Sequence, residues 1–266
     1  MKRTITIFAI LAMLSLNYCG IMKTKENDDN TSILALLLAS NGITNPNCTT
    51  SSVSAITSKL TQVPNSARTK YSISACDAAG FATIGLSSSG ITLGATGTST
   101  SSLIGSTGDI SLDQSKGGTS VEVTFTINNS SGYIDVIAYG SGTSLALSGP
   151  TYRLAAGAQA QYKKSADGSF ANTSKGSSVS APISNANTAY TYCLDFQYTA
   201  TGMRYMNGWD KACSSVSSTE RGSMMYYPIM QMMNVPVYTS GSKIGFVLNG
   251  ATITSFTVGT ILSETE

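Results

Sequence analysis

The sequence predicts an all-β protein, an antiparallel β-sandwich of the jelly-roll kind preceded by one or two short N-terminal helices. Short runs with a period of two recur between residues 71 and 258, and such alternation puts one side of a strand on a core and the other toward water. Clusters of Gly, Ser and Asn separate the runs, as is typical of strands joined by turns. Only 11% of the residues are charged, which disfavours a coiled coil.

The first residues have the layout of an export signal. Lys2 and Arg3 precede residues 5–16, which are nearly all apolar. This run is too short to span a bilayer as a helix but has the length of a signal-peptide core. We therefore expect residues 1–18 to be a signal peptide.

Cys19 follows this apolar run and is the predicted site of lipid attachment. The stretch Leu16-Asn17-Tyr18-Cys19 resembles the lipobox of bacterial lipoproteins. Asn17 and Tyr18 replace the small residues of the usual pattern, as in the looser lipoboxes of spirochaete, leptospiral-type surface lipoproteins. The resemblance implies acyl chains on Cys19. Each methylene that they bury in the bilayer contributes ~0.8 kcal/mol to the free energy of membrane binding. An ordinary signal peptide followed by an unrelated cysteine is the alternative.

Residues 19–47 are expected to form the lipidated N-terminus and a tether. Residues 22–32 are polar and carry charges of both signs, so they have little to bury. The apolar run within 32–40 predicts a short helix or a segment docked on the domain. The expected location is the cell envelope, with the protein anchored in the outer membrane and exposed at the surface.

The cysteine count fits this layout. Lipidation of Cys19 leaves four cysteines, an even number in an oxidising compartment. Of the three possible pairings, we favour Cys48–Cys76 and Cys193–Cys213, because each joins neighbours in sequence. Free thiols or a metal site are the alternatives, but the chain has no histidine and no Cys-x-x-Cys, which disfavours zinc. No cofactor is expected.

The charge balance argues against nucleic acid as a partner. The chain has 16 Lys and Arg and 14 Asp and Glu, and removal of Lys2 and Arg3 with the signal leaves 14 of each. A near-zero net charge without a basic block provides no electrostatic footprint for nucleic acid.

Residues 48–266 are expected to form the sandwich domain. A Ser cap within 52–63 predicts a short helix. In 121–127, Val121, Val123, Phe125 and Ile127 share one face. Residues 87–120 are rich in Gly, Ser and Thr but keep apolar positions, so we interpret them as short strands within the domain. The predicted strands are 71–76, 81–86, 109–112, 121–127, 133–139, 189–198, 243–248 and 252–258.

Residues 188–213 carry the most specific pattern. A strand, a turn at 200–202, a second strand, Gly-Trp-Asp and a closing cysteine suggest a hairpin tied by a disulfide. With the runs before and after it, residues 118–260 resemble the concanavalin A-like or laminin-G-like sandwich. The resemblance implies a curved sheet completed by a late strand, and only by fold analogy a capacity to bind sugars.

Two stretches are candidates for ligand binding. Trp209, if exposed, could stack a sugar ring with Asp210, Asn207 and Arg204 nearby, although a lone tryptophan beside a disulfide more often packs against it. Residues 224–233 hold five methionines, for which core packing, a partner surface and a Cu(I) site are the alternatives, in that order.

Catalysis has weaker support in the sequence. The absence of histidine excludes a Ser-His-Asp triad, and glycoside hydrolysis would need two facing carboxylates. Asp135, Asp195 and Glu220 are the candidates for that role. We therefore predict a non-enzymatic, lipid-anchored binding module for a glycan or a host or matrix protein. The alternatives are a carbohydrate-active enzyme and a coat protein without a ligand.

Overall fold

The fold is given by a computed structural model of the chain. The described residues are 48–56, 67–110, 117–158, 160–163, 170–172, 183, 187–198, 204–217, 219–220 and 241–262. They all belong to the unit Asn45–Glu266. The predicted signal peptide, Cys19, the tether, the segment 32–40 and the methionine-rich segment 224–233 lie outside these residues.

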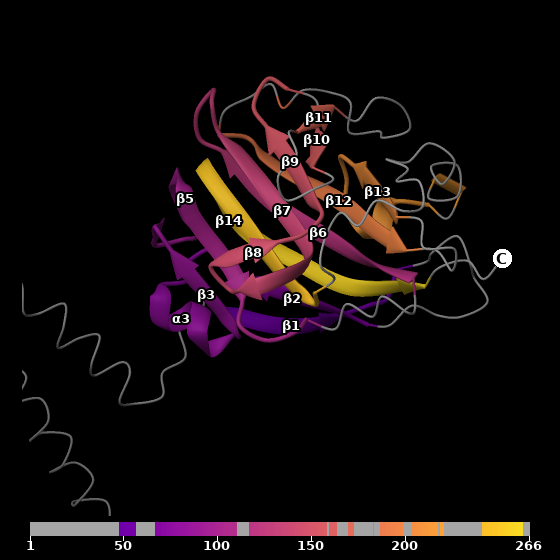
Figure 1. The fold of residues 1–266 in the computed structure, drawn as a ribbon, viewed down its shortest axis with the longest axis horizontal. Coiled ribbons are helices and arrows are strands. Elements are labelled where there is room, and N and C mark those ends of the chain that lie inside the picture. Colours follow the sequence, from indigo (N-terminus) through magenta and orange to yellow (C-terminus); the bar gives the residue numbers. More distant parts are fainter. Residues whose placement is uncertain are drawn as a thin grey trace, which may run out of the picture. The chain divides into compact units, whose positions relative to one another are not determined.

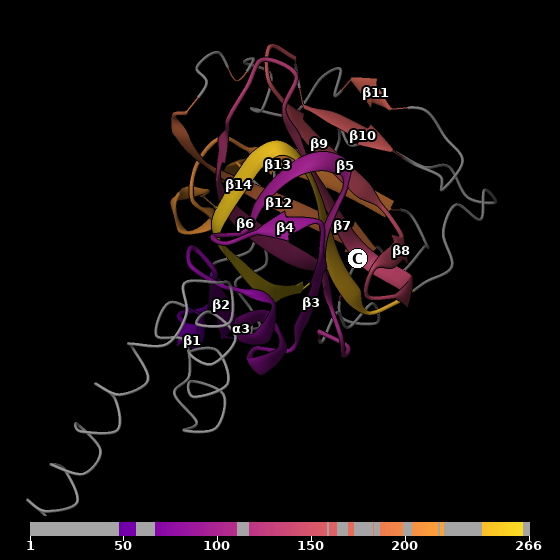
Figure 2. The same cartoon turned by 90° about the vertical axis from the view of Figure 1, so that its left-hand side faces the viewer.

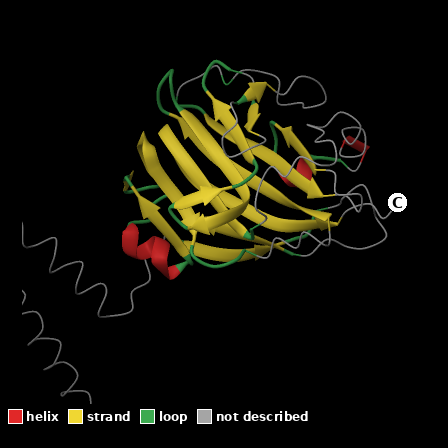
Figure 3. Ribbon diagram, viewed as in Figure 1, coloured by secondary structure: helices red, strands yellow, loops and turns green. Residues whose placement is uncertain are grey.

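Antiparallel strands dominate the described structure, which confirms the all-β prediction (Figure 3). Along its main path the sheet runs β11-β10-β9-β7-β14-β6-β12-β13. The strands are β1 Thr49–Val53, β2 Arg68–Ser72, β3 Leu86–Ser89, β4 Ile91–Thr92, β5 Thr96–Ser106, β6 Gly117–Ile127, β7 Tyr133–Thr143, β8 Ala146–Ser148, β9 Thr151–Ala155, β10 Gln161–Lys163, β11 Ala171–Asn172, β12 Ala189–Tyr198, β13 Arg204–Trp209 and β14 Lys243–Leu262.

Strand β14 organises the sheet. Its first half pairs with β7 on one edge and β5 on the other, and its second half pairs with β6 and β2. Figure 1 shows β14 in yellow between β5 and β7, and Figure 2 shows it arching over the interior. One half of the sheet therefore contains β5, β7, β9 and β10, and the other contains β1, β2, β6, β12 and β13.

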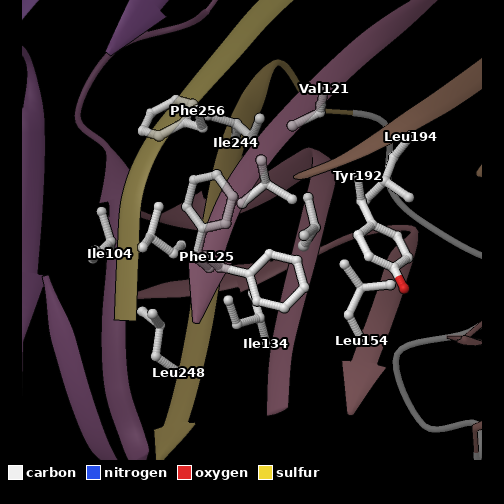
Figure 4. Close-up of a cluster of buried hydrophobic side chains, with 14 of the residues drawn as sticks. Ile104, Val121, Phe125, Ile134, Leu154, Tyr192, Leu194, Ile244, Leu248 and Phe256 are labelled. Carbon is white, nitrogen blue, oxygen red and sulfur yellow. The ribbon is translucent and has the colours of Figure 1, made fainter. Parts of the chain in front are cut away.

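The main core lies between the two halves of this curled sheet. Phe125 of β6, Tyr192 of β12, Ile134 of β7 and Leu154 of β9 all meet there (Figure 4). Each is at most 3% exposed. Since these residues come from both halves, burial of their apolar surface holds the halves together.

The period-two predictions for β6 and β12 are confirmed. Val121, Val123, Phe125 and Ile127 are all 0% exposed and belong to the core. Leu194 and Phe196 of β12 are 0% and 1% exposed and also belong to the core, whereas Cys193 and Asp195 alternate with them and point to the other side of the sheet. Strand β12 spans the predicted residues and pairs with β13 as the expected hairpin.

Both predicted disulfides are present. Cys48 bonds to Cys76 and Cys193 bonds to Cys213. The first bond fixes the N-terminal edge of the domain to the segment before the helix α3. The second ties β12 to the short 3₁₀ helix η2, Cys213–Ser215, after β13.

Several predicted elements need correction. Residues 52–53 end strand β1 rather than begin a helix, and residues 57–63 of that prediction lie outside the described structure. Residues 81–83 belong to helix α3, Ala78–Thr83, and not to a strand. The side chain of Asp77 caps this helix by accepting a hydrogen bond from the Gly80 N–H at 2.7 Å, which favours a helix start. The runs 243–248 and 252–258 form the single strand β14.

Candidate functional site

A pocket lies on the outer face of the sheet, over β7, β9 and β10. In β7, Ile134 and Val136 point into the core, so Asp135 between them points outward. Asp135 pairs directly with Arg153 across the β7–β9 ladder, and Lys163 of β10 lies on the same face. The pocket has a volume of about 340 Å³ and is lined by Asp135, Ile137, Leu147, Ser148, Gly149, Thr151, Arg153, Lys163, Phe170 and Val247.

An ion pair forms the polar part of this pocket. Arg153 Nε donates to Asp135 Oδ1 at 2.6 Å, and Arg153 Nη2 donates to Asp135 Oδ2 at 2.7 Å. The Asp135 side chain is 8% exposed and that of Arg153 is 24% exposed. This two-bond geometry is the strong form of an arginine–carboxylate contact, so it fixes both side chains.

Two aromatic rings pack against the guanidinium of Arg153. The Arg153 Cζ atom lies 3.9 Å from the ring centre of Tyr133 and 3.8 Å from that of Phe170. Tyr133 stands on β7 and Phe170 directly precedes β11. Both distances are well within the range of cation–π attraction. The guanidinium is therefore packed against two rings as well as bonded to Asp135.

The electrostatics of the pair follow from its partial burial. Burial raises the pKa of Asp135, while the hydrogen bonds and charge of Arg153 and the charge of Lys163 oppose that rise. Burial lowers the pKa of Arg153, but the hydrogen bonds and charge of Asp135 outweigh this effect, so its pKa is raised. Arg153 therefore stays cationic at physiological pH.

The predicted ligand residue Trp209 lies in a second, smaller core. Its indole is 1% exposed and belongs to what we call the disulfide cluster, formed by Ile56, Cys193, Trp209, Cys213 and Val216. Trp209 pairs with Cys193 across β12 and β13. This corrects the hypothesis that Trp209 stacks a ligand at the surface, because the side chain packs against the disulfide.

The predicted companions of Trp209 differ in their exposure. Asn207 is 2% exposed on β13, whereas Asp210 is exposed. The side chain of Arg204 lies outside the described structure. Burial, followed by the charge of Asp210 and then that of Tyr190, raises the pKa of Tyr192 to about 12, so the charge of Asp210 reaches Tyr192 on β12.

The three carboxylates that were candidates for catalysis have different surroundings and different partners. Asp135 is paired with Arg153 on one sheet half, and Asp195 is 0% exposed on the outer face of β12 in the other half. Since both flank core residues, their carboxylates point away from the main core and do not face each other across it. Glu220 accepts hydrogen bonds from Lys211 Nζ and from the N–H and hydroxyl of Ser217.

One group of described residues has side chains of the kinds that bind metals, but its cysteines are not free thiolates. Cys193, Asp195 and Cys213 have their ligand atoms within 4.8 Å of one another. The two sulfur atoms are bonded to each other, and zinc and related metals bind the deprotonated thiol. Two members of this trio, Cys193 and Cys213, are therefore the disulfide of the disulfide cluster, and Asp195 lies beside it.

The sequence prediction missed Arg153, Tyr133, Phe170 and Lys163. Residues 133–135 and 152–153 both carry a charged residue near an aromatic one, a signal that becomes visible only once β7 and β9 are known to pair. The hairpin strand β8 lies between them in sequence, so adjacency along the chain does not show the pairing.

Comparisons with known proteins give only remote similarities. No protein-family model matches the sequence and no curated protein matches it. A carbohydrate-binding module, CBM66, from Bacillus subtilis is 13% identical with a TM-score of 0.35, covering 67% of this chain and 93% of its own. A protein of unknown function from Shewanella oneidensis MR-1 is 11% identical with a TM-score of 0.33, covering 92% and 99%.

A third solved structure is a conserved carbohydrate esterase from the Shiga toxin-encoding bacteriophage phi24B. It is 10% identical with a TM-score of 0.30, covering 79% of this chain and 89% of its own. At such TM-scores the similarities carry no functional argument. Within the described ranges, no helix has the length and apolarity needed to cross a membrane.

Proposed function

We propose that this chain is a lipid-anchored protein of the cell envelope, held in the outer membrane and exposed at the surface, whose sheet domain binds a saccharide without transforming it. The observation that carries the proposal is the pocket over β7, β9 and β10, with its Asp135–Arg153 pair held between Tyr133 and Phe170.

The chemistry of the pocket suits a sugar. Sugar hydroxyls both donate and accept hydrogen bonds, and Ser148, Thr151 and the ion pair provide partners of both kinds. Phe170 and Leu147 provide apolar surface for the C–H faces of a ring. The volume, about 340 Å³, falls at the lower end of the range for small-ligand sites. Fixed polar groups also lower the entropy cost of binding.

The anchor is supported by the N-terminal sequence. A charged start, an apolar run and Leu16 three residues before Cys19 together match an exported lipoprotein. Metabolic labelling with a radioactive fatty acid tests this directly: we expect the wild-type protein to be labelled and a Cys19→Ala variant to lose the label. Equal labelling of both would contradict the anchor.

The binding proposal is tested with arrayed glycans and a panel of matrix proteins, using the full-length protein with both disulfides formed. We expect binding to saccharides that weakens at least tenfold in a Phe170→Ala variant. A Leu93→Ala variant is the matched control, because Leu93 is a 71% exposed apolar side chain that does not line the pocket. Binding to matrix proteins alone, or binding unaffected by Phe170→Ala, would contradict the proposal.

A further inference from the structure

The Arg153 guanidinium has N–H donors that no described residue accepts from. It carries five N–H groups, and Asp135 accepts from two of them, on Nε and Nη2. Among the described residues, Arg153 has no other hydrogen-bond acceptor. Its side chain is 24% exposed and lines the pocket, so the unused edge of the guanidinium is available to a ligand there.

The surroundings decide which acceptor fits that edge. The Arg153 Cζ atom lies 3.9 Å from the ring centre of Tyr133 and 3.8 Å from that of Phe170, so both rings pack against the guanidinium and its N–H edge is left for a ligand. A fixed, planar pair of N–H donors matches a carboxylate, which accepts two parallel hydrogen bonds. A hydroxyl offers one oxygen and matches this edge less well.

The charges of the lining residues point the same way. Asp135 is the one carboxylate among them, and Arg153 and Lys163 are the cations. Because Asp135 already shares both oxygens with Arg153, it does not occupy the remaining edge. Lys163 has a further interaction within the chain, so we assign the contact to Arg153 alone.

We propose that the saccharide bound in this pocket is acidic, a uronic acid or another sugar acid, and that its carboxylate binds the free edge of Arg153. This inference rests on the saccharide-binding function proposed above and names its substrate class. It makes Arg153 the residue that determines specificity, with Tyr133 and Phe170 as positioning residues.

A pair of ligands that differ only in charge tests the inference. Oligogalacturonate and its fully methyl-esterified form have the same sugar units, but the ester has no carboxylate. We expect the wild-type protein to bind the acid at least tenfold more tightly in calorimetry, and the preference to shrink as salt is raised. This comparison needs no variant, so it does not depend on whether a variant folds.

Variants then locate the contact. Arg153→Lys keeps a cation but loses the planar fork, and we expect it to abolish the preference for the acid. Lys70→Gln removes a cation on β2, in the other half of the sheet, and should leave the preference unchanged. Thermal unfolding of each variant checks that it remains folded, and the double variant D135N/R153Q, which leaves no unpaired charge, should also lose the preference.

The outcomes separate the two proposals. Binding of acid and ester with equal affinity, lost in Phe170→Ala, would support the saccharide function and overturn the acidic substrate class. An acid preference that survives Arg153→Lys would overturn the assignment to Arg153. Absence of binding to any saccharide, acidic or neutral, would overturn the function itself.

Discussion

Phe246 and Phe256 lie on the same strand, yet their ring centres are 4.8 Å apart. Ten residues of a straight strand would separate them by about 33 Å. Strand β14 therefore turns back on itself, and its two halves face each other across the core. The pocket borders the first half, through Val247, and Tyr71 of β2 stacks on Phe256 in the second half at 4.5 Å.

The turn in β14 depends on Gly250. This residue has φ +55°, and a Cβ there would overlap the carboxamide of Asn129. Its carbonyl also accepts a hydrogen bond from the Asn128 N–H at 2.7 Å. We expect Gly250→Ala to lower the free energy of unfolding by about 1–3 kcal/mol in urea denaturation, because it forces a non-glycine residue into the left-handed region.

Gly108→Ala is the control for this prediction. A Cβ at Gly108 would meet nothing within 4 Å, so this substitution should change the free energy of unfolding little. Equal stability of the Gly250 variant and the wild-type protein would contradict the role of Gly250 in the turn.

The parts of the fold that were predictable from sequence are those where one pattern continues without interruption. In β6, every second side chain from Val121 to Ile127 enters the core, because the strand is regular over these residues. The disulfide pairing was predictable because each bond joins cysteines that are neighbours in sequence. In both cases, information local in the sequence was sufficient.

The course of β14 was not predictable in this way. The core residues are Ile244, Phe246 and Leu248, then Ala251 and Ile253, then Phe256 and Val258, so the inward position changes from even to odd and back. Irregular pairing at 247–251 and at 253–255 causes these changes. A bulge adds a residue to one strand and reverses its alternation of inward and outward side chains. In the sequence, the single bent strand β14 therefore has the pattern of two separate strands.

The candidate site was harder still, because it depends on which strands pair. Asp135 was identified as a candidate from its strand, but its partner Arg153 became visible only with the β7–β9 ladder. For Trp209 the sequence left open a ligand role and packing against the disulfide, and the structure shows the packing. Its neighbours Ile56 and Val216 come from segments on either side of the sheet strands, and no local pattern shows that they cover it.

Removal of Arg153 should cost more than removal of the whole ion pair. Arg153→Met leaves the Asp135 carboxylate, 8% exposed, without its main partner, and we expect a loss of about 3 kcal/mol in the free energy of unfolding. The double variant D135N/R153M leaves no charge at either position of the pair, so its free energy of unfolding should fall by less than that of Arg153→Met. A double variant as unstable as the single one would contradict this account.

The loss in Arg153→Met should also depend on pH. Burial raises the pKa of Asp135, and Arg153 opposes the rise, so its removal raises that pKa further. The folded variant then holds a proton more tightly than the unfolded chain, and stability falls as pH rises from acidic toward neutral values. Urea unfolding at several pH values should show a larger difference from wild type at pH 7 than at pH 5.

Reduction of the Cys193–Cys213 bond should expose Trp209. The bond closes a loop with a sequence separation of 20 residues, and its loss in a double Cys→Ser variant should cost about 3 kcal/mol. Since Trp209 is the chain's one tryptophan and is 1% exposed, its fluorescence reports on the disulfide cluster. We expect blue-shifted emission in the native protein and a shift to longer wavelength in the variant.

The other disulfide provides a control for this fluorescence measurement. A double Cys→Ser variant of Cys48 and Cys76 removes a bond of similar loop length, with a separation of 28, but one that lies outside the disulfide cluster. Under conditions where this variant is folded, its tryptophan emission should match that of the wild type. An unchanged emission in the Cys193 and Cys213 variant would show that other contacts suffice to bury Trp209.

The segment after η2 should loosen only in strong acid. Hydrogen bonds from Lys211 and then Ser217, together with the charge of Lys211, lower the pKa of Glu220 from 4.5 to about 2. A lowered pKa means that this carboxylate stabilises the fold at pH values above 4.5 and loses that effect as the pH falls through about 2. An NMR titration of the Glu220 side chain should therefore show a midpoint near 2.

Two variants identify the cause of that low midpoint. Lys211→Met removes the donor with the largest effect, so the midpoint should move up toward 4.5. Lys70→Met removes a lysine on β2 that is not among the groups that lower the pKa of Glu220, and it should leave the midpoint near 2. A midpoint near 4.5 in the wild-type protein would mean that the contacts of Glu220 with Lys211 and Ser217 do not persist in solution, and that the segment between them is not held by this carboxylate.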